Sequence, residues 1–209
     1  AEISTVYLGG GTPSILPPDL MASVLESLRI AFSFQPNVEF SSEANPGTLT
    51  PEWLECVRRH GVNRLSMGVQ AVQDELLRSL GRVHTFLQAE EAFQLAREAG
   101  FSRLSADLMF ALPRQSLSDF RESIHRVAAL GTEHISAYSL IVEEGTPLYE
   151  EYGEMCADLE KYGDYASMPK RLQTKYEGCK CLPDEETDRN MYHHTKTTLA
   201  KLGYERYEI

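Results

Sequence analysis

Four side chains in this sequence have the chemistry needed to bind a charged small molecule that carries hydroxyl groups. They are two carboxylates, one amide and one guanidinium: Glu43, Asp107, Gln70 and Arg82. An Arg guanidinium pairs with a ligand carboxylate through two parallel hydrogen bonds, and a Glu carboxylate suits a ligand ammonium group. An amide and a second carboxylate suit vicinal ribose hydroxyls. Together these groups predict a ligand with an amino-acid end and a nucleoside end, as in S-adenosylmethionine.

A run of three glycines precedes these side chains. In the segment 6–14, an apolar run of β type leads into Gly9, Gly10 and Gly11, then into a Thr and a Pro. Adjacent glycines allow positive φ and let a ligand approach bare backbone amides, so the segment predicts an amide cradle. The alternative is a tight turn between a strand and a helix. A nucleotide fingerprint is excluded, because a Walker loop needs a Lys and the first Lys is Lys161.

Two members of the set have their own structural alternatives. Asp107 lies inside the apolar run 104–112, where an unpaired carboxylate is costly to bury and needs a partner. The alternative partner is a neighbouring loop amide. Glu43 stands just before Ala44-Asn45-Pro46, so its alternative is turn chemistry. The whole set indicates a binding site more strongly than any one member does.

Alternating strand and helix patterns position these residues. Short apolar or β-branched runs predict strands at 5–8, 38–42, 64–68, 104–109 and 134–140. The glycines, Glu43 and Gln70 follow the first three strands, Asp107 lies in the fourth, and Arg82 ends a short helix after the third. Parallel βα repeats place ligand sites at the carboxyl ends of their strands. The predicted set therefore converges on one edge of a sheet.

Capping residues predict where the helices begin and end. Helices are expected over 20–31, 51–59, 85–99, 116–130 and 187–201, with Thr50 as one N-cap and Ser116 with Asp119 as a capping box. A Gly follows four helix ends, at 61, 100, 131 and 203. A βα unit that repeats every roughly 30–40 residues predicts an α/β fold with a parallel sheet, either a barrel or a doubly wound sheet.

Composition narrows the class of protein. The 209 residues are 42% hydrophobic and 24% charged, with 31 acidic against 20 basic residues and a net charge of −11. No basic stripe occurs, so nucleic-acid binding is not expected. We find no apolar run long enough for a membrane span and no signal peptide. The four cysteines do not form a disulfide framework, which favours a cytoplasmic setting.

The ends of the chain predict a piece of a longer protein. There is no initiator Met, Ala1 leads almost directly into the first strand, and a strand is expected at 204–209. We expect the fold to be incomplete at both ends. The predicted division is a core at 1–152, an irregular surface excursion at 153–183, and a helix and strand at 184–209 that continue the core.

The sequence resembles the radical S-adenosylmethionine superfamily, and within it the HemN/HemW group. The motif 9–14, Glu43, the segment 64–70, Gly81-Arg82 and Asp107 occur in the family's order and at its spacing. The resemblance covers nearly the whole chain except about 155–181. It implies a partial (β/α) barrel of parallel strands.

The resemblance also implies which residues bind S-adenosylmethionine. In chain order they are Gly10, Gly11, Thr12, Glu43, Gln70, Arg82, Asp107 and Ile141. The first three match contacts to the methionine end, the Glu matches one at the ammonium, and the Arg matches one at the carboxylate. The Gln and the Asp match ribose contacts, and the Ile matches a backbone contact near the adenine.

Within the group, four segments favour the HemW type: 43–48, 80–84, 182–186 and 203–209. HemW-type proteins are heme chaperones, so the resemblance implies heme or porphyrin as a partner and respiratory proteins as heme acceptors. HemN-type proteins are oxygen-independent coproporphyrinogen III oxidases that decarboxylate propionate side chains. Chaperone and enzyme both stay open. A third alternative is an unrelated βα-barrel enzyme or an inactive fragment.

One family feature is missing from the sequence. The family holds a [4Fe–4S] cluster on a Cys-x3-Cys-x2-Cys loop, and this sequence has no such motif. Cys179 and Cys181 have the wrong spacing and place for that motif, and Cys156 is isolated, so free surface thiols are the alternative to a metal role. His193 and His194 do not complete a ligand set. We therefore expect no metal ligands in this chain, and no reductive cleavage of S-adenosylmethionine by the chain alone.

Overall fold

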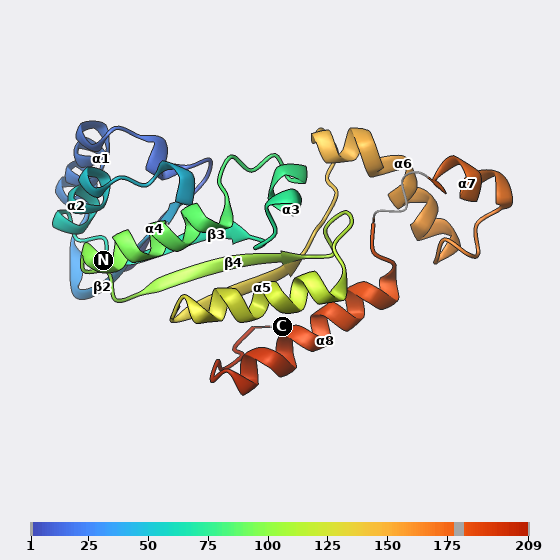
Figure 1. Cartoon of the computed structure of the whole chain (residues 1–209). Helices are drawn as coiled ribbons and strands as arrows, with labels where there is room; N and C mark the ends of the chain where they lie inside the picture. The colour runs from blue at the N-terminus through green and yellow to red at the C-terminus, as the bar shows by residue number, and fades with distance from the viewer. Residues whose placement is uncertain (1, 178–181, 209) are drawn as a thin grey trace. The chain divides into compact units, whose positions relative to one another are not determined.

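The computed structural model describes residues 2–177 and 182–208. It contains a sheet whose neighbouring strands follow chain order (Figure 1): β1 (Ile3–Leu8), β2 (Phe34–Ala44), β3 (Arg64–Gln70), β4 (Leu104–Phe110) and β5 (His134–Ser139). The first three pairs are parallel. Backbone bonds from Glu133 to Leu104 and from Leu140 to Phe110 advance in one direction along β4 and β5, as in a parallel pair. The prediction of five parallel strands is confirmed.

Helices separate the strands as the sequence predicts. They are α1 (Pro18–Ala31), α2 (Pro51–Arg59), α3 (Asp74–Ser79), α4 (Phe86–Glu98), α5 (Leu117–Ala129), α6 (Pro147–Tyr162), α7 (Lys170–Lys175) and α8 (Glu185–Lys201), with short 3-10 turns η1 (Pro13–Ile15) and η2 (Pro46–Thr48). The Thr50 hydroxyl accepts a hydrogen bond from the Trp53 amide and caps α2. Ser116 and Asp119 form the expected box at the start of α5. These local caps set the helix starts that position the strand ends.

The chain divides into two compact units. Unit 1 comprises residues 1–70, 83–108 and 127–136, and unit 2 comprises 71–82, 109–126 and 137–209. The core of unit 1 contains Phe40 and Trp53, both almost fully buried. Unit 2 has one apolar cluster around Leu77 and Leu112 and a second around Met155. Each unit therefore has buried apolar side chains of its own.

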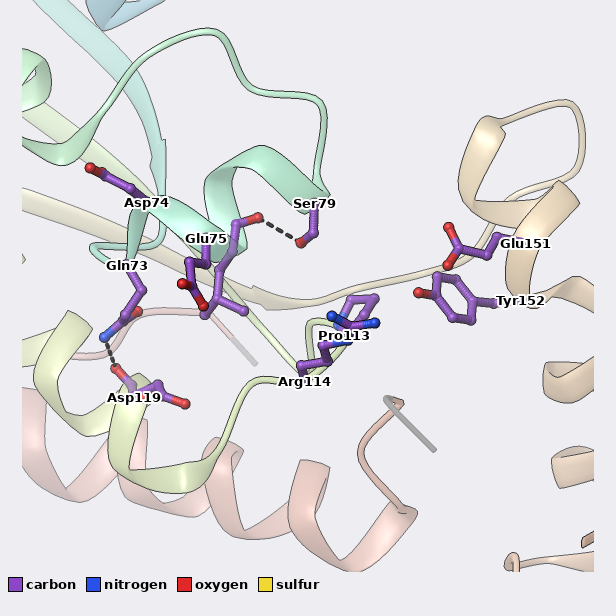
Figure 2. Close-up of a pocket in the computed structure, with 10 residues that line it drawn as sticks. Gln73, Asp74, Glu75, Ser79, Pro113, Arg114, Asp119, Glu151 and Tyr152 are labelled. Atoms are coloured by element: carbon purple, nitrogen blue, oxygen red, sulfur yellow. Dashed lines mark hydrogen bonds between the residues drawn. The ribbon is translucent and has the colours of Figure 1, made fainter. Parts of the chain in front are cut away.

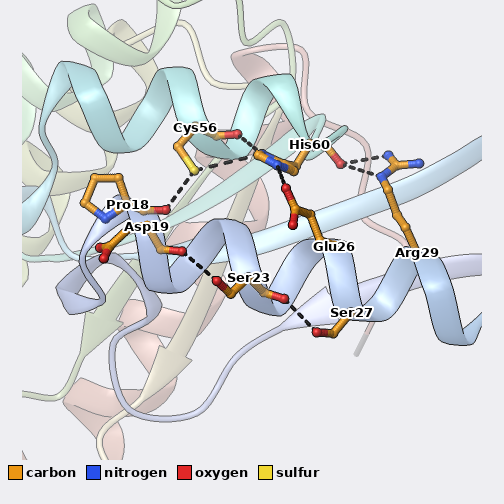
Figure 3. Close-up of polar contacts among 8 residues, drawn as sticks. All are labelled: Pro18, Asp19, Ser23, Glu26, Ser27, Arg29, Cys56 and His60. Atoms are coloured by element: carbon orange, nitrogen blue, oxygen red, sulfur yellow. Dashed lines mark hydrogen bonds and ion pairs between the residues drawn. The ribbon is translucent and has the colours of Figure 1, made fainter.

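Polar contacts join α1 and α2 in unit 1 (Figure 3). The Cys56 thiol donates to the Pro18 carbonyl at 3.1 Å, and burial raises the pKa of that thiol. The Arg29 guanidinium donates twice to the His60 carbonyl, at 2.7 and 3.0 Å, where α2 ends. The His60 ring lies 3.5 Å from Glu26. Cys56 is a free cysteine, as expected, and these contacts tie the two helices together.

The segment 153–183 is more regular than the sequence indicates. It contains the last turns of α6 and the whole of α7. Met155 and Leu159 lie about one helical turn apart in α6, and both belong to an apolar cluster with Met168 and Tyr176 that stabilises these helices. Charged residues between them hide this spacing in the sequence. Residues 178–181 lie outside the described residues. The predicted division of the chain at 152 and 183 stays a prediction.

The expected final strand is wrong for the residues that are described. Positions 204–208 carry no regular secondary structure, although Gly203 has the predicted positive φ of +91° after α8. A strand requires a ladder of backbone hydrogen bonds with a neighbour, and a β-type composition alone does not supply one. In the described part of the chain, no helix has the length and apolarity needed to cross a membrane.

Candidate functional site

The three glycines at the carboxyl end of β1 have different structural roles. Gly10 and Gly11 have φ of +82° and +62°, and nothing lies within 4 Å of a Cβ placed on either of them. They form the turn and leave their surroundings open. A Cβ on Gly9 would lie 2.6 Å from Tyr7 Cε1 and 3.1 Å from Glu43 Oε1. Gly9 therefore makes room for the Tyr7 ring and the Glu43 side chain.

Glu43 lies near the end of β2 and accepts two hydrogen bonds from neutral donors. The Tyr7 hydroxyl donates to Oε1 at 2.7 Å, and the Gly10 amide donates to Oε2 at 3.2 Å. Partial burial and the bond to Glu43 raise the pKa of Tyr7 to about 12, so this hydroxyl remains a donor at neutral pH. Among the described residues, Glu43 has no ion-pair partner. The two neutral donors therefore orient the carboxylate.

Asp107 lies in β4, opposite Gly68 of β3. Burial raises the pKa of Asp107, and the negative charge of Glu43 raises it further. Hydrogen bonds with Ser66, at 3.4 Å, and with Ser136 act in the opposite direction. The charge of Glu43 thus acts on Asp107 across β2, β3 and β4, and two carboxyl groups in this part of unit 1 make it favourable for a cation.

Gln70 ends β3 with unusual backbone geometry. Its φ is +69°, and the register with β4 shifts between Gly68 and Gln70. A non-glycine residue in the left-handed region costs about 1 kcal/mol, and such strain clusters at binding sites. Thr12, on the same unit, is the N-cap residue of η1. Gln70 itself is buried.

Two of the predicted ligand residues belong to unit 2. Arg82 follows α3, and its amide donates to the Leu77 carbonyl at 2.9 Å. Ile141 follows β5 and is 75% exposed. The structure brings Gly10, Glu43 and Asp107 together within unit 1. The ligand roles of all eight residues stay predictions, including those of Arg82 and Ile141.

Unit 2 contains a cavity of about 460 Å³ (Figure 2). Its walls come from α3, the loop after β4, the start of α5 and α6, and they include Glu75, Arg114, Asp119 and Glu151. Arg114 has a φ of +64°. The Asp119 carboxylate accepts a hydrogen bond from the Ser116 amide at 2.8 Å, and so takes part in the capping box of α5. None of the eight predicted ligand residues lines this cavity.

The residues present do not fit an iron–sulfur cluster. Among the described residues, no group of three or more His, Cys, Asp or Glu side chains is placed to hold a metal. Cys56 is buried and donates to a carbonyl, and Cys156 is free. Cys179 and Cys181 lie outside the described residues. His193 and His194 lie on α8, where the second contacts Thr198 at 3.0 Å, as expected for residues of that helix.

Sequence reasoning missed Tyr7, Ser66 and Ser136. Each lies two residues from another polar or glycine position, which is the spacing that places residues on one face of a strand. Tyr7 lies two residues before Gly9, Ser66 lies two residues after Arg64, and Ser136 lies two residues after His134. Alternating polar residues within otherwise apolar strands were the available indication that one sheet face is polar.

Comparisons with known proteins agree with this geometry. A family model described as the radical SAM superfamily matches residues 1–127. The heme chaperone HemW of Bacillus subtilis is 36% identical over 209 residues, which are 100% of this chain and 49% of that protein. The heme chaperone HemW of Escherichia coli is 31% identical over 99% of this chain and 48% of that protein. The chain spans about half the length of the curated relatives it matches.

A solved structure supports the fold. Coproporphyrinogen III oxidase (HemN) from Escherichia coli, described in its structure as a radical SAM enzyme, aligns with a TM-score of 0.76 and 25% identity. The alignment covers 98% of this chain and 42% of that one. The fold class is therefore α/β, with the parallel strands of a partial (β/α) barrel, as the sequence predicts.

Proposed function

The chain belongs to the radical S-adenosylmethionine superfamily, and on that premise we propose that it binds S-adenosylmethionine at the carboxyl ends of its strands. One observation carries the proposal. Glu43 is held by two neutral donors, and Asp107 adds a second carboxylate nearby. S-adenosylmethionine carries an ammonium and a sulfonium, so a site with an oriented carboxylate and a second carboxyl group suits it.

The remaining assignments follow the order of groups along the ligand. Gly10, Gly11 and Thr12 border the methionine end, where two glycines leave open space. Glu43 binds the ammonium. Gln70 and Asp107 bind the ribose hydroxyls, Arg82 binds the carboxylate, and Ile141 contacts the adenine through its backbone. These assignments are ours, and substitutions described below test those of Glu43 and Asp107.

A radical SAM domain implies two cofactors, S-adenosylmethionine and a [4Fe–4S] cluster. The residues described fit the first, through the open glycine turn and the oriented Glu43. They do not fit the second, because the 209 residues have no Cys-x3-Cys-x2-Cys motif. The ligands of the cluster are not among these residues. What this chain supplies is binding and orientation of the nucleoside and of the amino-acid end.

We propose a HemW-like role in heme transfer for the protein that carries this chain. The support is the similarity to HemW heme chaperones over the full length of the chain. Heme or porphyrin is then a partner, and respiratory proteins are the heme acceptors. The alternative of an unrelated βα-barrel enzyme is excluded by the family match.

The second candidate is a HemN-like oxidase, which the alignment with coproporphyrinogen III oxidase favours. The two roles differ in their products. A chaperone binds heme and releases it unchanged, whereas an oxidase removes carboxyl groups from propionate side chains.

We expect the full-length gene product to bind hemin saturably, with a shifted Soret band, and to transfer it to an apo-hemoprotein. In a parallel assay with S-adenosylmethionine and coproporphyrinogen III, chromatography should show no decarboxylated product. Bovine serum albumin, which binds hemin non-specifically, is the control for transfer. Appearance of a decarboxylated porphyrin together with absence of hemin transfer would replace the chaperone role by the oxidase role.

A further inference from the structure

We propose that Tyr7 is a positioning residue of the ligand site, whose hydroxyl orients the Glu43 carboxylate toward the cationic amino-acid end of S-adenosylmethionine. This inference rests on the proposed function, since it takes S-adenosylmethionine as the ligand. Tyr7 lies in β1 and Glu43 in β2, so the contact joins the two neighbouring strands just before the glycine turn.

The hydrogen bonds of Glu43 leave room for a ligand. Oε1 accepts from the Tyr7 hydroxyl at 2.7 Å, and Oε2 accepts from the Gly10 amide at 3.2 Å. A carboxylate offers about four acceptor positions, two on each oxygen. One donor on each oxygen fixes the plane of the group and leaves each oxygen able to accept again. A ligand ammonium can therefore bind without displacing either donor.

The packing around Gly9 holds Tyr7 in this pose. Tyr7 and Gly9 lie two residues apart, and the Tyr7 ring leans over Gly9, because a Cβ there would lie 2.6 Å from Cε1. The same Cβ would lie 3.1 Å from Glu43 Oε1. The ring is still more than half exposed, so a partial displacement would disturb Glu43 more than it would disturb the core. Because Gly9 has no Cβ, the Tyr7 ring and the Glu43 carboxylate can come into contact beside it.

The charges around the pair favour a cationic ligand. Partial burial, the bond to Glu43 and the charges of Glu43 and Asp107 raise the pKa of Tyr7 to about 12, while Arg64 lowers it. The hydroxyl therefore stays protonated. A neutral hydroxyl orients a carboxylate without cancelling its charge. An Arg or Lys at the same position would cancel that charge. The Tyr7 hydroxyl therefore fixes the orientation of the Glu43 carboxylate without adding a positive charge beside it.

The test compares two ligands. Tyr7→Phe removes the hydroxyl and keeps the ring, and we expect it to weaken S-adenosylmethionine binding about 10-fold in isothermal titration, as for loss of one hydrogen bond to a charged group. Binding of 5′-methylthioadenosine, which lacks the amino-acid end and the positive charge, should change less than about twofold. Tyr149→Phe is the matched control, because its hydroxyl donates to Glu144 at 3.3 Å on unit 2. It should alter neither affinity.

Two further variants separate positioning from a general structural effect. Gly9→Ala pushes the ring away and should cause the same ligand-selective loss. Tyr7→Phe should have no added effect in a Glu43→Gln background, because the hydroxyl acts through that carboxylate. Equal losses for both ligands, additive effects, or unchanged S-adenosylmethionine binding by Tyr7→Phe would overturn the inference and leave the proposed function standing. Failure of the wild-type chain to bind S-adenosylmethionine would overturn the proposed function itself.

Discussion

Asp107→Asn is expected to weaken S-adenosylmethionine binding about 100-fold, because two hydrogen bonds from ribose hydroxyls to a charged acceptor contribute roughly 1.5 kcal/mol each. Asn keeps the shape of the side chain and one acceptor oxygen toward Ser66 and Ser136. The loss in affinity therefore comes from the charge and the second acceptor. Isothermal titration of the wild-type chain and the variant measures it.

The same substitution is expected to stabilise the fold at neutral pH. Burial raises the pKa of Asp107 above its value of 3.8. The folded chain then binds a proton more readily than the unfolded chain, so stability falls as pH rises from 3.8 through the folded-state pKa. Above the folded-state pKa the ionised carboxylate opposes folding. We expect a higher Tm for Asp107→Asn than for wild type at pH 7, and a smaller difference below about pH 4.

Opposite changes in binding and stability exclude unfolding as the cause of weaker binding. Asp164→Asn is the control, because Asp164 is exposed on unit 2 and accepts from the nearby Ser167 amide at 2.6 Å. It should leave the affinity unchanged. Wild-type affinity in Asp107→Asn, or a lower Tm at pH 7, would contradict our description of Asp107.

Phe40→Ala is expected to lower the free energy of unfolding of unit 1 by about 3–5 kcal/mol, the cost of removing a fully buried aromatic side chain. Phe40 is 0% exposed, and its ring lies 6.0 Å from that of Phe34. It lies in β2, three residues before Glu43, so the same side chain anchors the strand that carries the ligand carboxylate.

Trp53 supplies the measurement for this variant. It is the single Trp of the chain and is buried in the same unit, so its fluorescence during urea denaturation reports on unit 1. Phe32→Ala is the control, since Phe32 is 50% exposed and should change stability by less than about 0.5 kcal/mol. A loss below about 1 kcal/mol for Phe40→Ala would show that β2 is not anchored as described.

Much of the fold follows from local chemistry in the sequence. Thr50 and Ser116 have the expected N-cap bonds, and Gly61 has the predicted positive φ after α2. Apolar runs predict each strand to within a few residues, because a buried parallel strand needs little besides apolar side chains and a turn. The order of the strands then places Glu43 and Gln70 at or next to strand ends and Asp107 within the neighbouring strand β4.

Contacts between residues far apart in the chain could not be predicted in this way. Tyr7 and Glu43 are separated by 36 positions, and only the register between β1 and β2 brings them together. The role of Gly9 follows from that same contact. The packing of Met155 with Met168 depends on a turn between two helices, and the weak spacing of apolar residues did not reveal it.

The most direct test of the central claim is a titration of the chain with S-adenosylmethionine in three forms: wild type, Glu43→Ala and Arg114→Ala. Arg114 lines the cavity of unit 2, which is the alternative place for a ligand. We predict saturable binding to wild type and to Arg114→Ala, and at least 30-fold weaker binding to Glu43→Ala, about 2 kcal/mol. Binding that survives in Glu43→Ala and is lost in Arg114→Ala would contradict the account.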